Sequence, residues 1–350
     1  MRSGIRSILF PLGMLYGGAV SVRNFGYDAK VFRARRLPIP VVSVGNITVG
    51  GSGKTPFVMF LIERLLSFGK RPAVLSRGYK RMADDLVISC PGKGSEPDVQ
   101  MIGDEPALIS QTFPNVPVAV HKDRYRAGLA VLESHGCDAF LLDDGLQNRE
   151  LYRDVDFVLI RNSMSDLRDT YLPAGNLRDS KRRVSQADVV VLTSHAAFEF
   201  READIDLIRK YSTAGIAGLS FLPSHLVDSA GSIRPLEKIA GKDVAAFCAV
   251  ANPGQFFDEL EKLGARIVSK TSYRDHHWFD EYDLDELFGG SEELLAVTTP
   301  KDAVRLFLDE ELSGREEMKR IMALHEKAVV NFGLEHIDSA LTGIFGEVHA

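Results

Sequence analysis

Cysteine is scarce in this 350-residue sequence, where Cys90, Cys137 and Cys248 stand isolated from one another. Their spacing matches neither a metal site nor a disulfide framework, which fits a reducing compartment. An excess of positive charge is also lacking, because 48 Asp and Glu outnumber 42 Lys and Arg and the formal net charge is −6. This charge excludes a general nucleic-acid-binding protein, which needs a basic face. The length and the hydrophobic fraction of 45% leave room for two globular domains.

A glycine-rich stretch, GNITVGGSGKT at residues 45–55, is the most informative segment of the sequence. A β-branched run at 40–44 predicts a buried strand before it, and apolar residues at helical spacing from 54 to 68 predict a helix after it. Backbone N–H groups of such a loop close around phosphate oxygens, the lysine reaches the β and γ phosphates, and the threonine can ligate Mg²⁺. The predicted nucleotide-binding residues are therefore Gly50, Gly51, Ser52, Gly53, Lys54 and Thr55.

One position departs from the usual P-loop pattern, which has glycine where this chain has Thr48. We expect Gly50 and Gly51 to supply the missing flexibility. The alternative is a glycine-rich turn that binds nothing, but Gly-Lys-Thr falls where a strand passes into a helix, as the motif requires.

Two adjacent carboxylates, Asp143 and Asp144, follow an apolar strand expected at 138–142. The sheets of α/β proteins present ligands at this end of their strands, and one or two carboxylates commonly hold Mg²⁺ against nucleotide phosphates. The sequence therefore predicts that both residues lie near the metal. The alternative is a turn or helix cap, because Asp-Gly often marks turns.

Phosphoryl transfer also needs a group that positions the attacking oxygen, and two polar clusters are candidates. Asp104 and Glu105 begin an expected helix, and Asp275 precedes His276 and His277. An aspartate made more basic by a nearby imidazole could take the proton of an acceptor hydroxyl. Alternatively, Asp104 only starts its helix, and the histidine pair lies on the surface or packs as a ring.

The N-terminal segment differs from the acidic remainder, because an apolar run at 8–20 is surrounded by basic residues, against Asp28 alone. A spanning helix needs about 20 apolar residues, and export by a signal peptide would separate the nucleotide loop from ATP. We therefore expect an interfacial helix on the cytoplasmic leaflet, where each basic residue is worth about 1 kcal/mol beside anionic lipid. The alternative is a helix packed on the protein's own core. The basic residues are Arg2, Arg6, Arg23, Lys30, Arg33, Arg35 and Arg36.

Strands that alternate with helices between residues 40 and 192 predict a mostly parallel sheet with helices on both faces. Periodicity is weak from 213 to 235, and a second alternation of strands and helices begins at 244. We therefore predict an α/β fold with a P-loop NTPase-type sheet, a second smaller α/β domain and an N-terminal interfacial helix. The expected boundaries are a membrane-associating helical segment at 1–36, a P-loop domain at 37–220 and the smaller domain at 221–350. A charged helix is expected at 311–327.

Several sequence blocks together resemble those of the tetraacyldisaccharide 4'-kinase family, the bacterial lipid A 4'-kinases. The resemblance runs in order from the N-terminal segment to about residue 305, and the set of blocks is highly specific. The blocks are SVGN through KTP at 43–56, SRGY at 76–79, GDEP at 103–106, DDGLQ at 143–147, PAGNLR at 173–178, NPGQFF at 252–257, DHH at 275–277 and TPKDA at 299–303.

The resemblance implies a P-loop kinase, with residues 37–220 as its kinase domain. It would use ATP and Mg²⁺ to phosphorylate the 4'-hydroxyl of a tetraacylated glucosamine disaccharide 1-phosphate in lipid A biosynthesis. The implied partners are this lipid and the cytoplasmic face of the bacterial inner membrane, with no nucleic acid and no obligate protein partner.

The same resemblance implies roles for individual residues. Asp104 would be the base, coupled to His276. The substrate's sugar and phosphate would suit guanidinium groups, although for any arginine the alternative is a solvated ion pair. Residues implied around the metal are Thr55, Glu105, Asp143 and Asp144, and those implied for the substrate are Arg77, Tyr79, Asn148 and Arg178.

Asn148 departs from the family pattern, which usually has histidine there. Asparagine can donate and accept hydrogen bonds but carries no proton at neutral pH, so we expect at most a positioning role.

Two other function classes fit the residues. One is a P-loop NTPase whose hydrolysis drives a protein partner, of the metal-insertion or targeting type. Members that bind GTP read guanine with Asn-Lys-x-Asp, and the nearest stretch here, TPKD at 299–302, has the wrong spacing. The other is a soluble small-molecule kinase, which would show no dependence on detergent or membrane.

Overall fold

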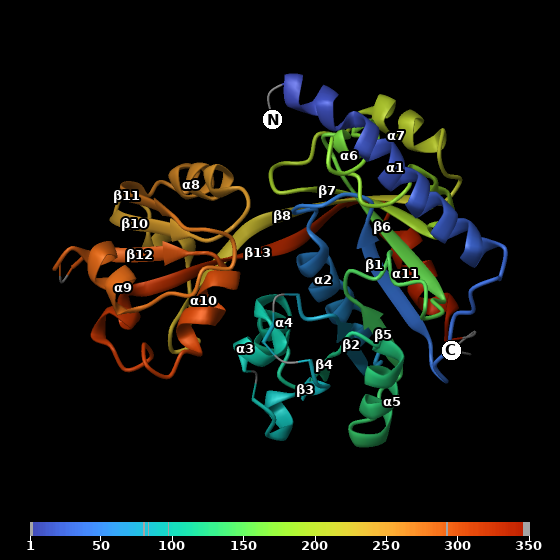
Figure 1. Ribbon diagram of the computed structural model, residues 1–350. Coiled ribbons are helices and arrows are strands. Elements are labelled where there is room, and N and C mark those ends of the chain that lie inside the picture. Colours follow the sequence, from blue (N-terminus) through green and yellow to red (C-terminus); the bar gives the residue numbers. More distant parts are fainter. Residues whose placement is uncertain (1–2, 80, 83, 97, 292, 346–350) are drawn as a thin grey trace.

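The computed structural model describes residues 3–79, 81–82, 84–96, 98–291 and 293–345, with only the backbone for residues 3–5. One mostly parallel sheet runs through this part of the chain in the order β11-β10-β12-β13-β8-β7-β6-β1-β5-β2-β4-β3, and β9 pairs with β8 (Figure 1). The predicted α/β class with a P-loop-type parallel sheet is confirmed.

The strands β1 to β7 carry the glycine-rich loop and its neighbours, and β8 to β13 complete the sheet. They are β1 Val41–Asn46, β2 Pro72–Ser76, β3 Val87–Ser89, β4 Val118–Val120, β5 Ala139–Leu142, β6 Val155–Arg161, β7 Val189–Ser194, β8 Gly215–Asp228, β9 Ile233–Arg234, β10 Asp243–Cys248, β11 Arg266–Ser272, β12 Leu295–Thr298 and β13 Ile321–Phe332. The helices are α1 Ser3–Asp28, α2 Lys54–Ser67, α3 Val99–Ile102, α4 Asp104–Thr112, α5 Arg124–Ser134, α6 Ser165–Arg168, α7 Glu202–Arg209, α8 Pro253–Lys262, α9 Glu281–Phe288, α10 Pro300–Phe307 and α11 Leu334–Gly343.

The central strands are buried on both faces, which explains why they read as continuous apolar runs. Every residue of β1 is buried. Val42 and Val44 pack into the core beneath α2, α4 and α11, whereas Val41 joins the opposite core with α5. Helices on both faces of the sheet are therefore required to exclude water from it.

Packing divides the molecule into two lobes that share the sheet (Figure 1). The P-loop lobe comprises the described residues from 3 to 221 and from 328 to 345, which supply nearly all of the side chains in the cores around β1, β6 and β7. The second lobe comprises residues 226–324, with cores on either side of β10 and β12. The antiparallel strands β8 and β13 pass from one lobe to the other, and the register of their pairing shifts at His325/Glu326.

The C-terminal helix α11 returns to the P-loop lobe. Ile337 and Leu341 of α11 lie in the same core as Phe57 and Leu61 of α2. The expected boundary at residue 220 falls inside β8, and α11 packs outside the lobe to which 221–350 assigned it. The division at 220 stays a prediction, and the lobes named here follow the packing.

The charged helix expected at 311–327 is wrong. A short 3₁₀ turn at Glu316–Arg320 leads into β13, which pairs antiparallel with β8. The charged residues before Ile321 concealed the apolar start of this strand, and the first four residues of β13 are buried. The partner strand is about a hundred positions away in the chain, so local periodicity could not reveal the pairing.

The N-terminal helix α1 lies along the P-loop lobe and exposes much of its apolar surface (Figure 1). Gly13 and Gly17 face the protein: a Cβ added at Gly17 would lie 2.5 Å from the Tyr171 ring. The exposed face carries Ile8, Phe10, Leu12, Met14, Leu15, Val22 and Phe25. No helix among the described residues is long and apolar enough to cross a membrane.

Candidate active site

The glycine-rich loop has the geometry of a phosphate cradle. Gly50 and Gly53 have φ angles of 104° and 75°, which favour glycine, and Gly53 caps the start of α2. A Cβ at Gly53 would lie 2.2 Å from the Phe221 ring, so β8 also requires glycine there. The loop thus presents backbone N–H groups and the positive end of α2 at one point.

Thr48 shows why this loop tolerates a threonine where the usual pattern has glycine. Its φ is not positive, so its backbone conformation does not require glycine. Its hydroxyl donates to Asp166 Oδ1 at 2.8 Å, and its backbone forms a bridge to Leu177. Thr48 therefore anchors the loop to the 166–177 segment.

The remaining loop residues are held from several sides. Ser52 Oγ accepts a hydrogen bond from Asn46 Nδ2 at 2.8 Å, and Thr193 donates to the Ser52 carbonyl at 2.9 Å. Thr55 is buried at the start of α2, and Gly51 lines the cleft.

Lys54 lies between the end of β1 and the end of β5. Its Nζ is 3.6 Å from Asp144 Oδ1 and 3.4 Å from Asn46 Oδ1. Arg178 pairs with the same Asp144 carboxylate and with Asn46. Burial opposes the ionisation of Asp144, but the bonds from Arg178 and the charge of Lys54 outweigh it and lower the pKa of Asp144 to about 2.

Asp143 stands apart from its neighbour because it is buried, and its Oδ1 has no hydrogen-bond partner among the described residues. Burial, together with the negative charges of Glu105 and Asp144, raises the pKa of Asp143 to about 7. A buried carboxylate oxygen without a donor is expensive unless a cation is supplied to it.

Asp104 sits at the first turn of α4, where three side chains converge. His276 Nδ1 lies 2.9 Å from Asp104 Oδ2, and Arg305 Nη1 donates to the same oxygen at 2.8 Å. Asp104 Oδ1 accepts from the backbone N–H of Glu105 at 3.0 Å. The structure therefore brings together Asp104 and His276, which lie 172 positions apart in the chain.

The expectation that an imidazole makes Asp104 more basic is wrong in direction. Burial opposes its ionisation, but the hydrogen bond with His276 and the cations of the second lobe prevail and lower the pKa of Asp104 to about 2. Asp104 is therefore an ionised carboxylate at neutral pH, and a weak proton acceptor.

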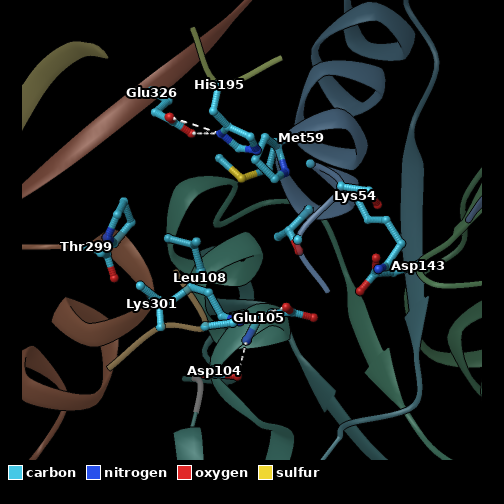
Figure 2. Close-up of a pocket in the computed structure, with 18 of the residues that line it drawn as sticks. Lys54, Met59, Asp104, Glu105, Leu108, Asp143, His195, Thr299, Lys301 and Glu326 are labelled. Atoms are coloured by element: carbon cyan, nitrogen blue, oxygen red, sulfur yellow. Dashed lines mark hydrogen bonds and ion pairs between the residues drawn. The ribbon is translucent and has the colours of Figure 1, made fainter. Parts of the chain in front are cut away.

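Glu105 faces the cleft opposite the glycine loop and pairs across the lobes with Lys301, whose Nζ is 2.8 Å from Glu105 Oε1. In Figure 2, Lys54 and Asp143 lie on one side of the pocket and Lys301 and Thr299 on the other, with Glu105 between them. Of the carboxylates expected around a metal, Glu105 and Asp144 already pair with cations, whereas Asp143 has a buried oxygen without a hydrogen-bond partner among the described residues.

The residues implied for the substrate lie along the same cleft. Arg77 and Tyr79 follow β2 and are exposed, and the Tyr79 ring is 5.8 Å from that of His276. Asn148 lines the cleft too, but its Oδ1 accepts from the backbone N–H of Leu151 at 3.3 Å, which serves the loop itself. The cleft between the lobes has a volume of about 2550 Å³.

Sequence reasoning assigned no role to Lys301, Arg305 or Asn46, all of which contact predicted site residues. Lys301 and Arg305 lie four positions apart in a helix that follows a strand, a spacing that places both on one face. This spacing can be read from the sequence, but the sequence does not indicate that Lys301 contacts Glu105 or that Arg305 contacts Asp104.

A second histidine–carboxylate pair was also missed. His195 Nδ1 lies 3.2 Å from both oxygens of Glu326, beside Met59 on the wall of the pocket (Figure 2). Glu259 of α8 lines the same cleft from the second lobe.

Known proteins resemble this chain in sequence and in fold. The family described as tetraacyldisaccharide-1-P 4'-kinase matches residues 5–342. A relative named tetraacyldisaccharide 4'-kinase from Aquifex aeolicus is 36% identical over 306 residues, covering 86% of this chain and 90% of the relative. One of the same name from Syntrophus aciditrophicus is 36% identical over 328 residues, covering 89% and 87%. The crystal structure of LpxK from Aquifex aeolicus in complex with ATP has a TM-score of 0.82 and 33% identity, covering 97% of this chain and 99% of that one. The chain therefore belongs to the tetraacyldisaccharide-1-P 4'-kinase family.

Proposed function

We propose that this protein transfers the γ-phosphoryl group of ATP to the 4'-hydroxyl of a tetraacylated glucosamine disaccharide 1-phosphate. The observation that carries the proposal is one cleft in which the Lys54 loop and the buried Asp143 face the Asp104–His276 pair. Family membership favours this function over a hydrolase that drives a protein partner.

The glycine loop and Lys54 hold the triphosphate, with the helix N-terminus aimed at its oxygens. The donor set at Asp143 and Thr55 fits Mg²⁺, because Asp143 Oδ1 is buried without a donor and this metal usually takes few protein ligands. No group of three or more His, Cys, Asp or Glu in the described part of the chain forms a protein-only metal cage. When bound, Mg²⁺ neutralises charge that builds up on the phosphates.

In the transfer, the 4'-oxygen bonds to the γ-phosphorus as the bond to the β–γ bridging oxygen breaks, and ADP leaves with that oxygen. The hydroxyl proton passes to the Asp104–His276 pair. A weakly basic carboxylate suffices, because the transition state is loose and the proton moves late. Arg77 and Tyr79 orient the acceptor's sugar and phosphate, while Arg178 ties Asp144 to the loop; Asn148 supports the neighbouring loop.

The test is a transfer assay with ATP, Mg²⁺ and the disaccharide 1-phosphate lipid, with mass spectrometry of the product. We expect one added phosphate at the 4' position, and none when that position is already phosphorylated. Asp104→Asn should slow turnover by about 100-fold or more with ATP affinity kept, the range for loss of a general base. Asp98→Asn is the matched control, because Asp98 only caps α3. Nucleotide hydrolysis without lipid product, or full turnover by Asp104→Asn, would contradict the assignment.

We also propose that α1 seats the protein on the cytoplasmic face of the inner membrane. Its exposed apolar face supports this, although part of the basic segment is engaged elsewhere. Arg35 pairs with Asp123, and Arg36 with Asp154. Arg2 lies outside the described residues. Apolar burial therefore supplies more of the proposed affinity than charge does.

A vesicle experiment tests this seating. Ile8→Asp with Leu15→Asp removes two exposed apolar side chains and should weaken binding to anionic phospholipid vesicles by at least about tenfold, since burying each is worth about 1.5–3 kcal/mol. Tyr282→Asp, at an exposed aromatic of the second lobe, is the control. Equal co-sedimentation of all three proteins would rule out α1 as the anchor.

A further inference from the structure

Lys301 is a cation that the second lobe extends toward the phosphate loop. It follows Thr299, whose hydroxyl caps α10 by accepting from Asp302 N, and Pro300 at the first helical position. This rigid start fixes the direction in which the Lys301 side chain leaves the helix. Its Nζ reaches the opposite lobe and binds Glu105 at 2.8 Å.

Two lysines therefore approach the same group of carboxylates from opposite lobes. Lys54 Nζ is 3.6 Å from Asp144 Oδ1, and Lys301 Nζ is 2.8 Å from Glu105 Oε1. Figure 2 shows the same order across the pocket, with Asp143 and Lys54 facing Glu105 and Lys301. Both lysines line the same cleft as the glycine loop.

We propose that Lys301 is a catalytic cation whose ammonium contacts the γ-phosphoryl group during transfer, and that Glu105 holds it in position beforehand. This inference rests on the proposed kinase function. During transfer the γ-phosphoryl group carries charge over three equatorial oxygens while the bond to ADP breaks and the bond to the acceptor oxygen forms. Lys54 serves these oxygens from the loop, and Lys301 would serve them from the acceptor side.

The alternative is that Lys301 only locks the lobes together. Its pair with Glu105 is poorly suited to that task, because the two side chains are 28% and 37% exposed and such pairs contribute little to stability. Arg305, one turn later, has the features of a lock, since it and its partners Asp104 and Asp302 are buried. A partly exposed ammonium in the cleft is free to exchange its carboxylate for a phosphate.

The test compares binding of the ground state with binding of a mimic of the transition state. Lys301→Met keeps the length and removes the charge, Lys301→Arg restores a charge, and Lys270→Met is the matched control. Lys270 is in the same lobe and also holds a glutamate, Glu261, but outside the cleft. Each protein is titrated with ADP and Mg²⁺, with and without aluminium fluoride, and its thermal midpoint is measured.

We expect Lys301→Met to lower kcat by about 100-fold, as loss of one transition-state donor does, and to weaken the ADP–aluminium fluoride complex by a similar factor. ADP alone should bind within about twofold of the unchanged protein, because this interaction belongs to the transition state. Lys301→Arg should recover part of both losses, and Lys270→Met should lose neither.

Equal weakening of ADP and of its aluminium fluoride complex, or a kcat within threefold of the unchanged protein, would overturn the proposal and leave Lys301 as a lock. The analogue needs no lipid, so the two proposals fail separately. Suppose that the lipid is not phosphorylated, but that Lys301→Met still weakens binding of the ADP–aluminium fluoride complex and not of ADP alone. The proposed acceptor would then be wrong, and the proposed role of Lys301 would remain supported.

Discussion

The two lobes build their shares of the cleft in different ways. The P-loop lobe supplies a continuous segment, from Asn46 to Thr55, and two carboxylates at the end of a neighbouring strand. The second lobe supplies His276, Lys301 and Arg305, which come from a loop and from one face of α10. The P-loop lobe therefore contributes a local sequence motif, whereas the residues of the second lobe reach the site only when the two lobes pack together.

The shares also differ in charge. The P-loop lobe brings Asp104 and Glu105 to the boundary, and each is met by cations or imidazole from the second lobe. The contacts of the buried Asp104 with His276 and Arg305 thus join the two lobes, and Asp104 and His276 also belong to the proposed reaction. The loop network of Lys54 with Asp144, in contrast, lies entirely within one lobe.

The largest expected effect of a substitution is at Arg305, whose contacts join the two lobes. Arg305→Met removes the guanidinium that pairs with the buried carboxylates of Asp104 and Asp302, so we expect the free energy of unfolding of the second lobe to fall by about 3–5 kcal/mol. The measurement is urea unfolding followed by Trp278, the single tryptophan, which lies in that lobe.

Arg178→Met is the matched variant in the P-loop lobe. Its partner Asp144 is 38% exposed, so the loss should stay within about 1 kcal/mol. Similar losses for Arg178→Met and Arg305→Met would mean that the cross-lobe pairs are no more structural than the loop pairs.

A smaller effect on stability, dependent on pH, is expected at Glu259 of the second lobe. Burial and the nearby Glu326 raise the pKa of Glu259 to about 7, against partial relief from His195 and Lys262. Because the folded pKa lies above the unfolded value, this glutamate costs stability as the pH rises toward and through 7, and little near pH 5. Glu259→Gln should therefore raise the thermal midpoint at pH 8 and change it little at pH 5.

Glu261→Gln, on the same helix, is the control, because its carboxylate is half exposed and pairs with Lys270. An equal gain for Glu259→Gln at both pH values would remove ionisation as the cause.

The nucleotide side of the site could be predicted because its information is contiguous. A strand, a glycine loop and a helix occupy residues 41–67, and β1 and α2 begin or end within one or two residues of the expected positions. Asp143 follows β5 for the same reason. In these segments, local periodicity and turn chemistry determine the structure.

The rest depended on pairings between distant parts of the chain. Glu105 and Lys301 are 196 positions apart, and Asp104 and Arg305 are 201 apart. The residues marked His276 as a candidate, but only the family resemblance coupled it to Asp104. The same distance concealed β13, whose charged surroundings resembled a helix until β8 was placed beside it.

The return of α11 to the P-loop lobe has a consequence for biosynthesis. On the ribosome, Ile337 and Leu341 emerge after the whole of the second lobe, yet they complete the hydrophobic layer beneath α2. The second lobe can therefore fold first, because the core of the P-loop lobe is incomplete until α11 has been translated. This order reverses the usual N-to-C order of domain folding.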